Sequence, residues 1–286
     1  MNGPAREPSA DDPEPVKADD KTGSQRNDAT GQGDEDLERL DYLQLTRDLA
    51  DRCDAETRLR IRSAMGVKAP RLVTELGTAM SVGERAATCC WGCAGGDHVI
   101  EHLLGACIGT THAGLRLAYL GYYDEAISLA RHVAERANLL YLFCIDGHSL
   151  NEWRASDSEY RRKNYSAIRV RLRIEGSGKN VPTPEDHYKT LSSYGAHPGR
   201  IPQSHNPRNR PTLGGFFEPS GFFVALNEIA RSMILSSAFS APLLEGTAVP
   251  VNRLVDTALS AAEYLGGVNT MSIEGFFEQL GAGDSP

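Results

Sequence analysis

Five polar side chains recur at helical spacing within a stretch of the chain that is otherwise apolar. They are Asp124, Ser128, Arg131, Glu135 and Asn138, separated by 4, 3, 4 and 3 residues. An arginine and a glutamate four residues apart can pair on one helix face. In the middle of a helical bundle, this polar line would either border a cavity or form an internal network that fixes the register of the helix.

The cavity interpretation defines a candidate catalytic site. Arg131 would bind an anionic group, and Glu135 or His197 would transfer a proton. Asn138 is the candidate binding residue on the same helix face. Because His197 stands near the end of the segment LSSYGAHP, this site exists only if that segment folds back onto the helix.

A second group of chemically active side chains lies between residues 89 and 102. Cys90 and Cys93 form a C-x-x-C pair, and His98 and His102 are four residues apart on one helix face. Thiolate and imidazole groups are ligands that zinc prefers, so zinc is the one cofactor that the sequence suggests. The gap between Cys93 and His98 is shorter than in common zinc fingers, and free buried cysteines are the alternative interpretation.

The net charge of −8 conceals a basic region in the middle of the chain. Residues 154–210 contain 12 basic and 5 acidic side chains, whereas residues 1–40 contain 5 basic and 11 acidic ones. Arginines interleaved with aromatic residues suit a phosphate backbone and unstacked bases, so RNA is one expected partner. A merely solvated charged face is the alternative. The candidate binding residues of this region are Trp153, Arg154, Arg161, Arg162, Lys163, Arg169 and Arg200.

The first 36 residues contain four prolines and no Leu, Ile, Phe, Tyr or Trp. A segment this poor in apolar side chains cannot offset the roughly 1–2 kcal/mol of backbone entropy that each residue loses on folding. We therefore expect residues 1–36 to be a disordered acidic tail, which could occupy the basic region of the same molecule. Residues 37–92 would form an N-terminal helical region, and residues 93–286 the main helical bundle with a long loop at 195–218.

The periodicity of the apolar residues is almost entirely helical, so the expected fold class is all-α. Residues 168–174 are ambiguous, because apolar and basic side chains alternate there as in a strand. No convincing second strand exists to pair with this segment, so we predict a helix in which Tyr165, Ile168 and Leu172 share the covered face. The other expected helices span residues 36–51, 54–65, 70–80, 97–120, 122–143, 184–194, 219–239, 251–265 and 272–280.

The composition favours a bacterial, cytoplasmic protein. The N-terminus has no basic start followed by an apolar run, so we expect no secretory signal, and we expect the six cysteines to be thiols. Arginine outnumbers lysine by 24 to 6, which suits a GC-rich bacterial genome. The most apolar late segment, residues 221–244, is interrupted by Asn227, Glu228 and Arg231. We therefore expect a buried amphipathic helix and no membrane partner.

Several short motifs resemble those of a bacterial family of uncharacterised all-helical proteins. They are YLGYYDEA at residues 119–126, Arg131 and Glu135 on the same helix, EWR at residues 152–154, and LSSY followed by His197 and Pro198. That family is itself similar to HEPN domains, which are helical bundles found in many toxin and anti-phage ribonucleases. The resemblance covers roughly residues 100–200. It implies a HEPN-like helical bundle, a homodimer by analogy, and a role in stress or phage defence.

The HEPN ribonucleases that this chain resembles combine an arginine with a histidine that follows it after four to six intervening residues, usually near a helix start. The only such pair here is Arg200 and His205, and it lies in a proline-rich loop. The sequence therefore favours a non-catalytic helical interaction or regulatory protein with a protein or RNA partner, and it leaves enzymatic activity undecided. Two alternatives stay open. One is a HEPN-like ribonuclease with a non-standard site at Arg131, Glu135 and His197, and the other is a sensor of an anionic small molecule.

Overall fold

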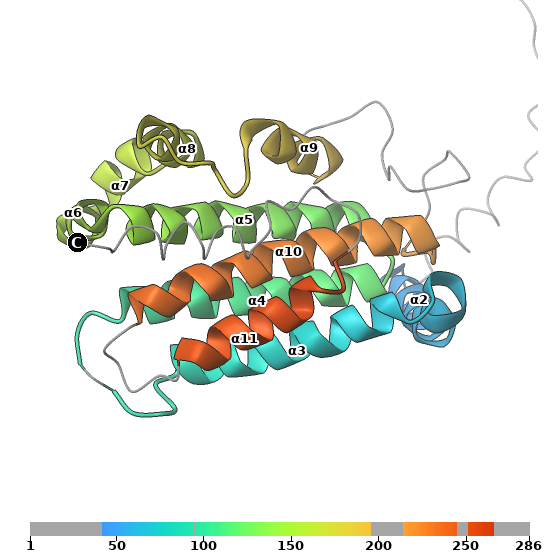
Figure 1. Cartoon of the computed structure of the whole chain (residues 1–286). Helices are drawn as coiled ribbons and strands as arrows, with labels where there is room; N and C mark the ends of the chain where they lie inside the picture. The colour runs from blue at the N-terminus through green and yellow to red at the C-terminus, as the bar shows by residue number, and fades with distance from the viewer. Residues whose placement is uncertain (1–41, 94, 196–213, 245–250, 266–286) are drawn as a thin grey trace, which may run out of the picture. The chain divides into compact units, whose positions relative to one another are not determined.

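The computed structural model describes residues 42–93, 95–195, 214–244 and 251–265 (Figure 1). All regular structure within these ranges is α-helical, which confirms the all-α fold class. The expected acidic tail, the helix expected at 272–280 and most of the expected loop 195–218 lie outside the described residues. The described helices are α2 (Tyr42–Met65), α3 (Lys68–Ala87), α4 (Val99–Tyr119), α5 (Tyr123–Ile145), α6 (Gly147–Ala155), α7 (Ser158–Asn164), α8 (Ala167–Gly176), α9 (Glu185–Gly195), α10 (Pro219–Leu243) and α11 (Val251–Ala262).

Two long helices, α5 and α10, pack against each other at the centre of the bundle. α4 packs against both of them, and α3 packs against α4, α10 and α11. On the other side of α5, α8 and α9 lie against it, joined by a short extended connection (Figure 1). α5 is therefore covered on opposite sides, and its polar line has neighbours to contact in α8, α9 and the connection between them.

α10 is central because its sequence is almost entirely apolar. Among the described helices it is the one that is long and apolar enough to cross a membrane, and 83% of its most apolar window is buried within the bundle. Of its buried hydroxyl groups, those of Ser236 and Ser240 are satisfied within the helix, whereas those of Ser232 and Ser237 have no hydrogen-bond partner among the described residues. Ser236 donates to the carbonyl of Ser232 at 2.9 Å, and Ser240 donates to that of Ser236 at 2.7 Å. Ser236 and Ser240 consequently bury no unpaired hydroxyl against the apolar neighbours.

Two expected helices near the N-terminus are one continuous helix in the structure. The sequence predicts a break at Asp54, with this carboxylate capping a second helix. In α2, Asp54 instead lies inside the helix and pairs with Arg58 at 2.7 Å, one turn later. Glu56 and Arg60 form the next pair at 2.5 Å. These pairs at i and i+4 support a continuous helix, so the acidic residue stabilises the interior of α2 and does not begin a new helix.

The ambiguous segment at 168–174 is helical, as predicted, and Tyr165 is buried, but the other two residues predicted on its covered face are exposed. In α8 the side chains of Val170, Arg171 and Ile174 are buried, whereas Ile168 is 59% exposed and Leu172 is 52% exposed. Apolarity predicts the opposite face, because it assigns Arg171 to solvent. The arginine is buried because its guanidinium stacks on an aromatic ring of α9, which the sequence pattern cannot reveal.

The corner between α4 and α5 holds the segment that leads into α10. Gly121 forms this corner with a φ of 82°, and residues 214–218 lie on it. The Tyr123 hydroxyl donates to the Phe216 carbonyl at 2.9 Å and accepts from the Glu218 amide at 2.9 Å. The Glu218 side chain also caps the first turn of α10. The start of the central helix is thus fixed to the α4–α5 corner.

Candidate anion-binding pocket

Arg131 and Glu135 contact each other on α5, as their spacing predicts. The Arg131 Nε lies 3.2 Å from Glu135 Oε1, and the Tyr188 hydroxyl of α9 donates to the same oxygen at 2.8 Å. Arg131 also donates to the Tyr188 oxygen, and its guanidinium carbon lies 4.6 Å from the centre of the ring. Burial, together with the Glu135 carboxylate, raises the pKa of Tyr188, so the hydroxyl keeps its proton. These polar atoms join α9 to α5, while His197 lies outside the described residues.

We expect Tyr188→Phe to lower the free energy of unfolding by about 1 kcal/mol. The substitution removes one hydroxyl that both donates to Glu135 and accepts from Arg131, and it keeps the ring between the helices. Urea-induced unfolding followed by circular dichroism measures this difference. An unchanged free energy would show that Arg131 and Glu135 join α9 to α5 equally well without the hydroxyl.

The last member of the polar line, Asn138, holds the connection between α8 and α9. Its Nδ2 donates to the Thr183 carbonyl at 3.0 Å, and its Oδ1 accepts from the Thr183 amide at 2.9 Å. Both residues are buried, so these two bonds satisfy backbone groups that water does not reach. Residues 179–184 are thereby fixed against α5. Asp124 and Ser128, at the other end of the line, are half-buried.

A pocket of about 390 Å³ opens beside this connection. Small-molecule sites in proteins typically enclose about 300–1,000 Å³, so the pocket has room for a small ligand. Its walls come from the end of α8, the α8–α9 connection, α9 and α10. The lining residues are Glu175, Lys179, Asn180, Val181, Pro182, Pro184, His187 and Arg231.

Arg231 of α10 is the unusual member of this lining. It is only 7% exposed, and its Nη2 donates to the Pro182 carbonyl at 2.6 Å. Among the described residues, nothing accepts a hydrogen bond from its Nε or its Nη1. Burial lowers the pKa of this guanidinium below its usual value, although the nearby Glu228 acts in the opposite direction. A buried cation with two unsatisfied donors is costly. Because both nitrogens are themselves covered, an oxyanion in the pocket would satisfy them after a movement of the neighbouring lining.

The other charged groups of the pocket differ in their exposure. His187 Nε2 lies 2.7 Å from Glu228 Oε2, and both side chains are mostly buried. Lys179 and Glu175 are exposed, so they lie where the pocket meets solvent. A single oxyanion would therefore have Arg231 as its buried cation and Lys179 as its exposed one. Glu175 places a negative charge at the same opening.

No family model, curated protein or solved structure matches the chain. The pocket is therefore interpreted from its own geometry. The sequence pattern does not single out Arg231, His187 or Lys179 as site residues, although a signal exists in α10. Glu228 and Arg231 are charged and three residues apart in a segment that otherwise supplies the core, and buried charges of this kind are rare. From the sequence alone, these two charges are equally well explained as the exposed face of an amphipathic helix. The burial of Arg231 in the structure excludes this explanation for the arginine.

Two basic residues expected at a nucleic-acid surface have structural contacts. Arg154 pairs with Asp97 at 2.9 Å and so joins α6 to the start of α4. Arg161 donates to the Trp153 carbonyl at 2.9 Å, and its guanidinium carbon lies 4.1 Å from the centre of a Trp153 ring. Trp153 itself is partly buried against the core. These side chains therefore stabilise the packing of α6 and α7.

A neighbouring carboxylate joins three helices of the basic region. Glu152 of α6 accepts hydrogen bonds from Tyr160 at 2.5 Å, from Tyr165 at 2.5 Å and from Arg173 at 2.8 Å. These bonds lower the pKa of Glu152 to about 2, so the carboxylate stays ionised at neutral pH. The exposed basic candidates are consequently fewer than the sequence indicates. They are Arg162, Lys163 and Arg169, together with the side chain of Arg154, while Arg200 lies outside the described residues.

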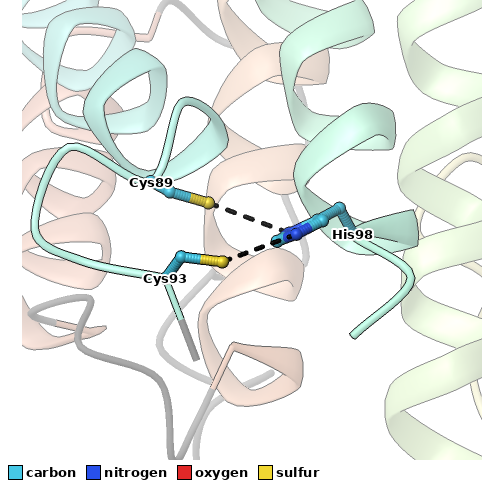
Figure 2. A group of neighbouring side chains, drawn as sticks. All are labelled: Cys89, Cys93 and His98. Atoms are coloured by element: carbon cyan, nitrogen blue, oxygen red, sulfur yellow. Dashed lines mark hydrogen bonds between the residues drawn. The ribbon is translucent and has the colours of Figure 1, made fainter. Parts of the chain in front are cut away.

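The predicted metal ligands are only partly brought together. Cys93 and His98 face each other, and Cys89 joins them where the sequence predicts Cys90 (Figure 2). Cys90 and His102 are exposed and lie outside this group. Residues 88–91 form a turn after α3, so consecutive cysteines point in different directions and the C-x-x-C spacing does not identify the right one.

Proposed function

We propose that this protein is a non-catalytic regulatory helical bundle that binds a small anionic molecule in the pocket at Arg231. The observation that carries the proposal is the buried guanidinium, whose Nε and Nη1 have no acceptor among the described residues. A carboxylate or phosphate group supplies several acceptor oxygens and a negative charge, and hydrogen bonds between ionised partners are the strong ones. The pocket volume limits the ligand to a small molecule.

The composition of the pocket favours binding over catalysis. Its described lining contains no serine, threonine or cysteine that His187 could activate as a nucleophile. His187 is itself paired with Glu228. The apolar part of the lining, Val181 with two prolines, suits the hydrocarbon part of a small organic acid or phosphate ester.

The position of the pocket supports a regulatory role. Its walls combine α10 with the α8–α9 connection, which Asn138 holds against α5. A ligand between these elements would stabilise one arrangement of them over others, and this is how a small molecule shifts a conformational equilibrium. A protein or RNA partner that binds the exposed basic side chains of α7 and α8 would then respond to the ligand.

The remaining sequence-based expectations belong to the same proposal. A HEPN-like bundle, a homodimer and a role in stress or phage defence rest on the resemblance of short motifs, and RNA binding rests on the charge pattern. The ribonuclease alternative gains support from the contact between Arg131 and Glu135, but Tyr188 already engages the polar atoms of both. RNA cleavage by the full chain that His197→Ala abolishes would favour the ribonuclease.

We expect inorganic phosphate or succinate to raise the melting temperature of the full chain, and Arg231→Met to remove this response. A ligand at 100 times its Kd adds about 2.7 kcal/mol to the free energy of unfolding. Without ligand, Arg231→Met should match the wild-type stability or exceed it by about 1–2 kcal/mol, because methionine buries no unpaired donor. Scanning calorimetry measures stability and isothermal titration measures affinity. Comparing the two anions distinguishes a phosphate site from a carboxylate site.

Arg169→Met is the matched control, because it removes an exposed arginine of α8 that does not line the pocket. This variant should keep the full response to the anion. If it lost the response as completely as Arg231→Met, the anion would be binding the basic surface. If ligand-free Arg231→Met were strongly destabilised, Arg231 would be a structural group held by its bond to Pro182, and the proposal would lose its main support.

A further inference from the structure

Three ligand atoms meet in the connection between α3 and α4 (Figure 2). The Cys93 Sγ lies 3.5 Å from His98 Nε2, and the Cys89 Sγ lies 3.8 Å from His98 Nδ1. The donor atoms of the three residues all lie within 4.8 Å of one another. A tetrahedral zinc ion, with bonds of about 2.3 Å to sulfur and about 2.0 Å to nitrogen, separates these two ligand types by about 3.6 Å. The spacing of Cys93 Sγ and His98 Nε2 therefore fits a zinc ion bound through Nε2. Cys89 Sγ, which faces the other ring nitrogen, lies within 4.8 Å of the other two donor atoms and would complete the ligand set.

His98 occupies the N-cap position of α4, yet its side chain makes no capping hydrogen bond. Histidine is not a preferred N-cap residue, and its φ of 53° is a left-handed conformation that costs about 1–2 kcal/mol. Its ring instead faces the two thiols, and Glu101 Oε1 lies 3.5 Å from Nδ1. A carboxylate beside one ring nitrogen orients the imidazole and leaves Nε2 for a metal, an arrangement common among zinc-bound histidines.

The two cysteines show related features. Cys89 also has a φ of 53°, and it is, with His98, one of the two non-glycine residues with positive φ in the described part of the chain. The Cys93 sulfur accepts a hydrogen bond from the Gly95 amide at 3.3 Å, which fixes the position of the sulfur in the connection. Backbone strain is therefore concentrated on two of the three candidate ligands. This concentration indicates that the connection is shaped to bring the donor atoms together.

We propose that Cys89, Cys93 and His98 bind one zinc ion, with the fourth position open to solvent or to Glu101. Two thiolates balance the charge of the ion, and sulfur with imidazole selects zinc over magnesium or calcium. Binding releases the protons of the two thiols. The ion links the turn after α3 to the N-cap residue of α4. This site is separate from the anion pocket and does not depend on its ligand.

The full chain, without a histidine tag, is expected to bind one zinc ion per molecule after it has been stripped with a chelator and its thiols reduced. Isothermal titration and elemental analysis give the stoichiometry. Cobalt in place of zinc should give the absorption of a tetrahedral thiolate site. Cys89→Ser and Cys93→Ser should each abolish stoichiometric binding, and Glu101→Gln should weaken it about tenfold. Zinc should also protect Cys89 and Cys93 from alkylation, as measured by mass spectrometry.

Cys90→Ser and His102→Ala are the matched controls, since both residues are neighbours in sequence that lie outside the group. Both variants should keep one zinc ion per molecule, and Cys90 should stay open to alkylation. Circular dichroism of each variant shows whether it folds, and the wild-type stoichiometry tests the site without any substitution. No zinc binding by the wild-type chain, or an equal loss in Cys90→Ser, would overturn the proposal.

Discussion

Replacing Gly215 by alanine is expected to lower the free energy of unfolding by about 3–4 kcal/mol. A Cβ at this position would overlap the carbonyl group of Leu120, at 2.7 Å from its carbon, and would come within 3.2 Å of the Gly121 Cα. These are backbone atoms, so no rotation of a side chain relieves the overlap. Residues 214–218 would have to leave the α4–α5 corner, and the start of α10 would lose its attachment. Urea unfolding followed by circular dichroism measures the loss.

Gly109→Ala is the matched control for this substitution. It adds the same methyl group to a glycine inside α4 where no atom lies within 4 Å of the new Cβ. This variant should gain about 0.5–1 kcal/mol, because alanine has a higher helix propensity than glycine. The two glycine substitutions should therefore have opposite signs. A Gly215→Ala protein as stable as the wild type would contradict the placement of residues 214–218 on the corner.

The parts of the fold that the sequence predicts well are the long, strongly periodic helices. The apolar pattern identifies α5 and α10, and both occupy the centre of the bundle. α5 does so as a nearly all-round apolar helix should, whereas the helix at 221–244 is expected to be amphipathic and is instead buried almost all round. The apolar pattern gives the wrong result where a single charged side chain determines a helix boundary or a buried face. Asp54 looks like a cap but forms an i,i+4 pair with Arg58, and Arg171 looks exposed but is buried against a ring of α9. The first case is decided by a local pair within α2, and the second by a tertiary contact with another helix.

For the candidate sites, too, the sequence predicts contacts within one helix but not the partners from other segments. Helical spacing correctly places Arg131 and Glu135 in contact, yet their common partner Tyr188 is more than fifty residues away in the chain. Spacing also identifies Cys93 and His98, but the turn at 88–91 substitutes Cys89 for Cys90. The direction in which a turn points its side chains depends on backbone dihedral angles that the order of residues does not reveal.

Two buried arginines near α9 lower the free energy of unfolding because their donors are not all satisfied. Arg171 and Arg231 are each 7% exposed, and each has at least one nitrogen without a hydrogen-bond partner among the described residues. Arg171 lies over the Tyr188 ring at 4.8 Å, whereas Arg231 borders the pocket beside His187. Unsatisfied buried donors are unfavourable for folding alone, so the buried arginine that borders the pocket, Arg231, is the feature on which the proposed binding site depends.

Asn138→Ala is expected to lower the free energy of unfolding by about 3 kcal/mol and also to weaken anion binding. The amide and the carbonyl of Thr183, a residue with 0% exposure, would both lose their partner, and each unsatisfied buried group costs about 1–3 kcal/mol. The Pro182 carbonyl, which accepts from Arg231, belongs to the same connection. Loss of the Asn138 contacts should therefore release one wall of the pocket. Hydrogen exchange at the Thr183 amide and anion titration measure the two effects.

Asn151→Ala is the matched control, because Asn151 is exposed on α6 and should change stability by less than about 0.5 kcal/mol. The comparison separates the two roles of Asn138, since folding and ligand binding are measured on the same protein. If Asn138→Ala lowered stability but left anion affinity unchanged, the α8–α9 connection would not position the ligand. Arg231 would then bind the anion from α10 alone. If both quantities fell while Asn151→Ala behaved as wild type, the buried amide would be the element that couples the bundle core to the pocket.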